Sequence, residues 1–351
     1  MKHLYKFIAL VFIFMIGIAF FSKSIPSISV STTTASSIQD STFPMVYLQV
    51  GESFINPLHG YSSELNSSTV RESITPLDTG KTFAVNIAEN DSKIKKLSYE
   101  LRDIANNKSI ETGDITAFDK NKKYKVATVH LKEAMDTSTE YGFCMTLITN
   151  YSKKIHFYTR IKYYDNDFFL SKKLDFVAKF HAATFDQGKS LDLSQYLESG
   201  TNDDSSYESV DIHSSRKLIT WGKLKPKKLT DVVPTVKELN IETAAISQTY
   251  FVSATTASGS ETYQVKEFYR VRYSGGRIYL LYFKRTMEAI FDPSLISINK
   301  SEVKIGISSA EDLDITSSDS NKKFAFVRNG SLWYYDLKKN ELNNVFSFET
   351  G

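Results

Sequence analysis

The feature that most constrains the fold is a succession of short runs in which apolar and polar residues alternate. Polar turn segments such as ENDSK, NNKS and DKNKK separate the runs. Alternation places successive side chains on opposite faces, which is typical of half-buried antiparallel strands. The predicted strands are 45–50, 82–88, 95–103, 124–132, 141–150 and 154–164. Together they predict an immunoglobulin- or fibronectin-like β-sandwich over residues 43–164.

The period changes after this region. Residues 166–186 carry apolar side chains, Ala178 among them, at helical spacing, with lysines such as Lys173 on the opposite, solvent-facing side. This predicts an amphipathic helix, and Gly188 is expected to end it. A shorter helix is predicted at 190–199, with Ser190 as its cap. Further strands are predicted at 209–214, 217–224, 244–256, 263–273 and 277–291. Gly275-Gly276 between the last two is a hairpin signal, and the whole predicts an α+β domain over 165–300.

The end of the chain has the most regular pattern. After a polar connector at 301–323, the segments FAFV, SLWYYDL and NNVFSF predict three strands, the first two joined at Asn329-Gly330. This stretch, 324–351, resembles one blade of a TolB-like β-propeller. One blade cannot bury both faces, so we expect an incomplete propeller-like β-meander and a longer parent protein. A simple terminal meander is the alternative.

A wider resemblance rests on the segments MVYLQVGESFINPLHGY, ESITPLD, FYTRI and LWYYDL with VFSF. They resemble uncharacterised single-anchor extracytoplasmic proteins of Gram-positive anaerobes. The resemblance implies a surface location. It implies no activity and no catalytic residues.

The N-terminus contains the uncharged apolar run Phe7–Phe21 behind Lys2 and Lys6. A full membrane span needs about 20 apolar residues, whereas a signal-peptide core needs about 7–15. We expect residues 1–23 to form an uncleaved membrane helix (a signal-anchor), with a cleaved signal or a buried core helix as alternatives. Because positive charges stay in the cytoplasm, the bulk of the chain should be extracytoplasmic in a single-pass cell-membrane protein. The Ser/Thr-rich residues 24–42 predict a flexible linker.

The amino-acid composition limits the classes of partner that this protein is expected to bind. A net charge of +3, with both signs interspersed, provides no footprint for nucleic acid. The single cysteine excludes an intramolecular disulfide framework. The expected partners are therefore the membrane, through the N-terminal helix, and cell-envelope polysaccharide or a membrane protein.

Motifs for catalysis are incomplete. Gly80-Lys81-Thr82 lacks the first glycine of a P-loop and precedes a predicted strand. Three S-x-x-K matches lack the partner motifs of penicillin-binding enzymes, and the histidines show no zinc-ligand spacing. Cys144, in an apolar strand, is expected to be a buried, inert thiol. We predict no catalytic residue, no cofactor and no metal site.

One basic patch stands out, with Trp221 inside it. It can recognise an anionic ligand such as a lipid headgroup, teichoic acid or acidic polysaccharide, or it can be a solvated strand–turn face. Its residues are Arg216, Lys217, Lys223, Lys225, Lys227 and Lys228.

These features favour a non-enzymatic, membrane-anchored binding or scaffolding protein of the cell surface, acting in envelope or polysaccharide assembly. Two alternatives remain open. One is a surface glycan-active enzyme whose site lies in a further C-terminal region. The other is an anchored sensor or regulatory protein that works through a membrane partner.

Overall fold

The computed structural model is mainly β, with 54% strand and 9% helix, as the alternating pattern predicts. The structure describes residues 43–66, 71–90, 92–106, 108–121, 123–198, 206–256, 259–290, 298–299, 302–303, 315–328, 331–339 and 341–347. Among these residues, no helix has the length and hydrophobicity of a membrane span. The predicted anchor and linker lie outside them.

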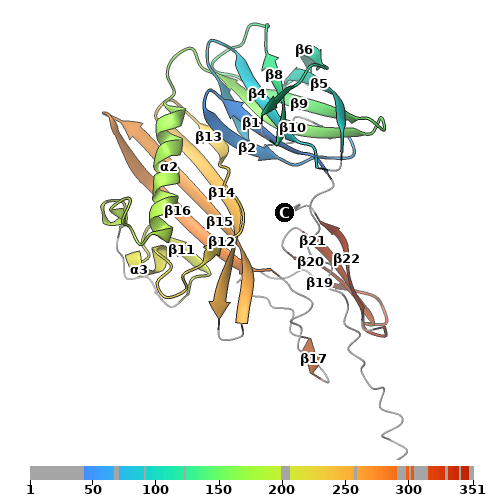
Figure 1. Ribbon diagram of the computed structural model, residues 1–351, viewed down its shortest axis with the longest axis vertical. Coiled ribbons are helices and arrows are strands. Elements are labelled where there is room, and N and C mark those ends of the chain that lie inside the picture. Colours follow the sequence, from blue (N-terminus) through green and yellow to red (C-terminus); the bar gives the residue numbers. More distant parts are fainter. Residues whose placement is uncertain are drawn as a thin grey trace, which may run out of the picture.

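Two five-stranded sheets form the first part of the fold (Figure 1). The first has the order β2-β1-β4-β8-β7 and is antiparallel throughout. Its strands are β1 (Met45–Val50), β2 (Ser53–Leu58), β4 (Thr82–Ala88), β7 (Asp119–Asn121) and β8 (Tyr124–His130). The second has the order β3-β10-β9-β5-β6, in which β3 and β10 are parallel. Its strands are β3 (Ile74–Leu77), β5 (Ile94–Asp103), β6 (Lys108–Ile115), β9 (Glu140–Thr149) and β10 (Lys154–Tyr163).

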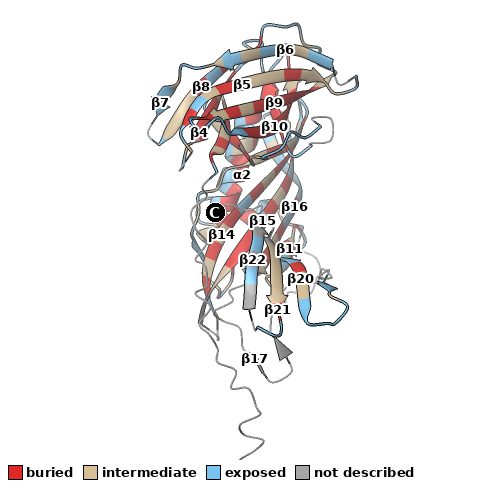
Figure 2. Ribbon diagram, turned by 90° about the vertical axis from the view of Figure 1, so that its right-hand side faces the viewer, coloured by how far each residue is buried: buried red, intermediate tan, exposed pale blue. Residues whose placement is uncertain are grey.

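The two sheets share one apolar core. The rings of Phe83 in β4 and Phe143 in β9 meet edge to face at 5.3 Å, and both are buried. Alternation in β9 turns Met145 and Leu147 inward as well. Figure 2 shows that the edge strands β6 and β7 are instead exposed or half-buried.

A helix-backed sheet follows, in the order β11-β16-β15-β14-β12, with β13 also paired to β14. The Gly275-Gly276 turn joins β15 and β16 with positive φ at both glycines, as predicted. Helix α2 (Leu170–Phe185) lies across one face (Figure 1). The strands are β11 (Ser209–Asp211), β12 (Lys227–Lys228), β13 (Thr235–Leu239), β14 (Thr243–Thr256), β15 (Gly259–Ser274) and β16 (Arg277–Ala289).

The buried stripe of α2 differs from the predicted one. Ala178 is exposed, whereas Lys173, expected on the solvent face, is fully buried. The Lys173 ammonium donates to the carbonyls of Phe168, Asn240 and Ile241 at 2.8–2.9 Å, which satisfies its three N–H groups. Burial nevertheless lowers the pKa of Lys173 to about 8.

Buried polar contacts join the sandwich strands to β13. Asn56 in β2 is fully buried, and its side chain donates to the Ile74 carbonyl (2.8 Å) and accepts from the Val236 N–H (2.9 Å). Arg160 in β10 donates to the Lys237 carbonyl at 3.0 Å. The apolar core is also continuous across this junction, because one hydrophobic cluster runs from the sandwich into the helix-backed sheet.

The C-terminal strands form a four-stranded antiparallel meander, β19 (Ile315–Ser317), β20 (Lys323–Arg328), β21 (Ser331–Asp336) and β22 (Glu341–Ser347). The three strands predicted here are confirmed. The prediction of a connector without strands at 301–323 was only partly correct. This segment contains β19, and it also contains β18 (Glu302–Val303), which pairs with β17 (Ile298–Asn299).

Two further predictions were wrong. Of the helix predicted at 190–199, the described residues 190–198 form only a 3-10 turn, Leu193–Gln195, and Asp192 rather than Ser190 caps it. The strand predicted at 217–224 is instead the short helix α3 (Arg216–Ile219) and a turn. The positive φ values of Trp221 and Gly222 are incompatible with an extended strand.

Candidate functional site

The six residues of the predicted basic patch are all exposed, but they lie on three different elements. Arg216 and Lys217 belong to α3, Lys223 and Lys225 to the following loop, and Lys227 and Lys228 to β12. The fold brings three of them to the C-terminal end of α2, namely Arg216, Lys225 and Lys228.

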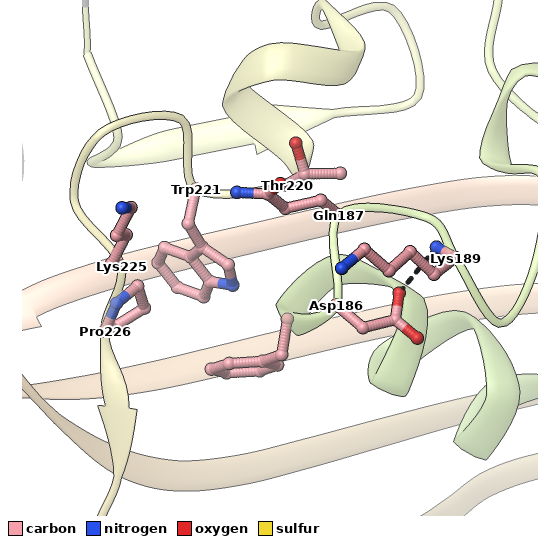
Figure 3. A pocket seen from close by; sticks show the side chains of 8 residues that line it. Asp186, Gln187, Lys189, Thr220, Trp221, Lys225 and Pro226 are labelled. Carbon is pink, nitrogen blue, oxygen red and sulfur yellow. Dashed lines mark hydrogen bonds between the residues drawn. The ribbon is translucent and has the colours of Figure 1, made fainter.

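A cleft of about 340 Å³ opens at this end of α2 (Figure 3). One wall is the last helical residue and the loop after it, and the other is the loop from α3 to β12. The cleft is lined by Phe185, Asp186, Gln187, Lys189, Thr220, Trp221, Lys225 and Pro226. Of the predicted patch, Lys225 alone is among these lining residues. Lys189 adds a cation from outside the predicted patch.

The first wall depends on how α2 ends. Gln187 and Gly188 have positive φ, and the Gly188 N–H donates to the Ala183 carbonyl at 2.7 Å, which ends the helix. A Cβ at position 188 would lie 2.7 Å from the Arg216 guanidinium. Arg216 in turn donates to the Gln187 carbonyl at 3.1 Å, so the loop and α3 are held together.

The one carboxylate that lines the cleft is already engaged. The Asp186 side chain accepts from the N–H groups of Lys189 (2.8 Å) and Ser190 (3.0 Å). Hydrogen bonding, first from the Ser190 side chain and then from these backbone groups, holds the pKa of Asp186 below its ordinary value. Asp186 therefore stays ionised and turned toward its own loop, and it leaves the lysines available to a ligand.

Trp221 forms the second wall and is held rigidly. It is 1% exposed, and the Arg285 guanidinium lies 3.4 Å from its ring centroid. Arg285, in β16, donates to the Leu218 and Ile219 carbonyls at 2.9 and 2.8 Å. The indole Nε1 has no hydrogen-bond partner among the described residues, and Figure 3 shows it directed into the cleft toward Gln187 and Asp186.

Behind the cleft lies a buried polar network centred on Glu267 of β15. Its carboxylate accepts from His181 Nδ1 (2.8 Å), Tyr250 Oη (2.8 Å) and Tyr269 Oη (2.7 Å). Burial raises the pKa of Glu267, but the attraction and hydrogen bond of His181, with help from Arg285, outweigh it and hold the pKa below its ordinary value. Burial first, and then the Glu267 charge, raise the pKa values of Tyr250 and Tyr269. The network fixes α2 against the sheet.

The network also reaches the cleft. Nε2 of His181 lies 3.5 Å from Lys228 Nζ, and this ammonium lies over the Phe185 ring at 4.9 Å. Lys228 therefore links the buried carboxylate to the rim of the cleft.

A sequence signal for this network existed. Glu267 stands between Val265 and Tyr269 on the apolar face of an alternating strand, and Arg285 stands likewise between Phe283 and Met287. A charge in the middle of an apolar face needs a buried partner. The partner cannot be named from one strand alone.

The other side chains that could take part in catalysis or metal binding do not form a second site among the described residues. In the part of the chain that the structure describes, no group of three His, Cys, Asp or Glu side chains is placed to hold a metal ion. Cys144 is half-buried on the outer face of β9, and burial raises the pKa of its thiol to about 11. Comparison of the sequence with protein-family models and with curated proteins finds no match to either.

Proposed function

We propose that this chain is a non-enzymatic, membrane-anchored binding or scaffolding protein of the cell surface that recognises an anionic component of the envelope, in envelope or polysaccharide assembly. The observation that carries the proposal is a group of four cations at the C-terminal end of α2, two of which line the cleft, while the only carboxylate that lines the cleft accepts hydrogen bonds from its own loop. The cations are Lys189, Arg216, Lys225 and Lys228. Such a cluster attracts polyanions and raises their local concentration.

The architecture supports a modular surface protein. The two packed five-stranded sheets support an immunoglobulin-like sandwich over 43–164, and the helix-backed sheet supports an α+β domain over 165–300. The C-terminal meander has the four strands of a propeller blade. The last three of them, β20 to β22, cover the stretch 324–351 and support its TolB-like resemblance, and β19 precedes it.

The ligand part of the proposal is tested with the full chain in a nonionic detergent. We expect it to bind immobilised teichoic acid or an acidic polysaccharide more tightly than neutral dextran, with affinity that falls as salt rises. Replacing the four cations by glutamine should abolish the difference. The matched control replaces four exposed sandwich lysines, Lys95, Lys120, Lys132 and Lys153. Equal losses in both variants would show that only net charge matters and would refute a localised site.

The topology is tested separately in intact bacterial cells. We expect the chain to resist carbonate extraction from membranes, and deletion of residues 1–23 to release it. Protease added to spheroplasts should degrade residues 43–351. Protection of these residues until lysis would contradict an extracytoplasmic location.

A further inference from the structure

The indole N–H of Trp221 is the most unusual polar group at the cleft. The side chain is almost fully buried, its ring packs against Arg285, and its N–H has no acceptor within the described part of the chain. Buried donors are rarely left unpaired, and each such group calls for an explanation. Figure 3 supplies the direction, because the indole nitrogen points into the cleft.

The chemistry of the missing partner follows from the donors. An indole N–H can only donate, and so can a lysine ammonium. A ligand that accepts from the Trp221 N–H in a cleft lined by Lys189 and Lys225 must therefore present acceptor oxygens, preferably charged ones, because charge-assisted hydrogen bonds are the stronger kind. Asp186 does not compete, since its carboxylate is bonded to backbone N–H groups.

The size of the site limits the ligand further. At about 340 Å³, the cleft lies at the lower end of the range of small-molecule pockets. It suits one sugar or polyol unit rather than a folded partner. The indole nitrogen itself is shielded from solvent, so the proposed ligand reaches it only if neighbouring side chains such as the exposed Gln187 and Lys189 rotate.

We propose that this cleft binds a single anionic unit, a carboxylate or phosphate group on a sugar-sized molecule, with the Trp221 indole N–H donating to one of its oxygens, Lys189 on the same side of the indole ring as this N–H, and Lys225 lining the cleft on the other side of the ring. This inference rests on the proposed function, because the unit would be one residue of the envelope polymer. A uronic acid and a polyol phosphate share the required chemistry.

The test follows the two indole N–H signals of the full chain in nonionic detergent by NMR, with Trp221→Phe assigning Trp221 and leaving Trp333. The probes are glucuronate, glycerol phosphate and, as the uncharged control, glucose. The Trp221 signal should move downfield with at least one anionic probe and stay in place with glucose, while Trp333 stays in place throughout. The more effective anion identifies the source of the group.

Variants sharpen the test. Trp221→Phe keeps an aromatic ring for Arg285 to pack against but removes the N–H donor together with part of the ring, so affinity for the anionic probe should fall at least tenfold. Lys225→Gln should weaken binding several-fold, and Lys227→Gln, a neighbouring exposed lysine outside the cleft lining, should not. Because Trp221 is buried, thermal unfolding of each variant verifies the fold, and Lys225→Gln tests the proposal even if Trp221→Phe is unstable.

The outcomes separate the two proposals. Equal shifts with glucose, or no effect of Lys225→Gln, would overturn the anionic subsite. If the polymer still bound in that case, the proposed function would survive. If neither polymer nor monomer bound, both would be wrong.

Discussion

At the scale of single residues, this protein places charged groups on apolar faces and gives each of them hydrogen-bond partners there, although Arg285 Nε has none among the described residues. Glu267, Arg285 and Lys173 are each 0–1% exposed. Each is matched by side-chain donors or by backbone carbonyls from another element. Burying a charge without such partners is strongly unfavourable, so these side chains specify how α2, α3 and the sheet fit together.

The first prediction concerns Glu267. Replacement by leucine leaves His181, Tyr250 and Tyr269 without their acceptor and should lower the free energy of unfolding by about 3–5 kcal/mol. Glu267→Gln should cost less, because an amide oxygen still accepts. Denaturant unfolding of the full chain measures the change, with the exposed Glu242→Gln as control. A leucine variant as stable as the control would contradict a structural role for the network.

The pH dependence of the same group has a definite sign. Because the folded pKa of Glu267 is lowered, the folded state binds its proton less readily than the unfolded chain, whose pKa is about 4.3. Its stabilising contribution is therefore complete above that value and is lost as the pH falls through the folded pKa. The acid limb of the stability profile should be shallower in Glu267→Gln.

The second prediction concerns Cys144. With a thiol pKa of about 11, only about one molecule in ten thousand carries the thiolate at pH 7. Alkylation by iodoacetamide should be slow and should rise about tenfold per pH unit up to pH 10. Urea-unfolded chain serves as the reference, with an ordinary thiol pKa. A rate in the folded protein equal to the unfolded rate at pH 7 would show that the thiol is not suppressed.

At the scale of elements, β13 is the connection that matters most. It pairs with β14 in the helix-backed sheet. Its Val236 N–H donates to Asn56 of the sandwich, and its Lys237 carbonyl accepts from Arg160 of the sandwich. A strand bonded on both sides cannot shift its register without losing buried hydrogen bonds. The orientation of the two parts thus depends on a few polar side chains rather than on apolar contact alone.

Asn56 allows a matched comparison. Asn56 and Asn90 both adopt left-handed backbone conformations, with φ of 51° and 47°, but only Asn56 is buried. Alanine at either position incurs a similar backbone cost. We expect Asn56→Ala to cost about 2–3 kcal/mol more than Asn90→Ala, because the Ile74 carbonyl and Val236 N–H lose their partners. Thermal unfolding measures both, and equal losses would mean that the junction is not supported by this residue.

At the scale of the whole molecule, the continuous hydrophobic cluster has a consequence for cooperativity. Its buried residues extend from Val46 in β1 to Phe283 in β16. Parts that share a core are expected to unfold together, whereas domains with small polar interfaces unfold separately.

Hydrogen exchange followed by mass spectrometry tests this prediction. Peptides from β9 and from β15 should exchange with the same opening free energy, within about 1 kcal/mol, and Asn56→Ala should lower both equally. Protection that differs by several kcal/mol between them, or a response confined to the sandwich, would show two independently folding units.

Much of the fold was predictable, because alternation and helical period are local properties. They located β1, β4, the long strands β14–β16, the turn at Gly275-Gly276 and helix α2. Strands β2 and β3 were missed because each contains a proline, which argues against a strand interior. β6 was missed because it is a polar edge strand without an apolar face.

The sequence by itself determined the mainly β class and the presence of a basic patch with Trp221 inside it. Only the tertiary structure decided that Lys225 alone of those cations lines the cleft, that Lys189 lines it too, and that Trp221 faces the cleft with its N–H unpaired among the described residues. The physical reason is that the pattern of apolar and polar residues indicates which side of a helix or strand is buried, but not which residue of another element it will contact. Contacts such as Arg285 on Trp221 and Glu267 on His181 join residues 64 and 86 positions apart in the chain, and the packing of α2 and α3 on the sheet alone brings them together.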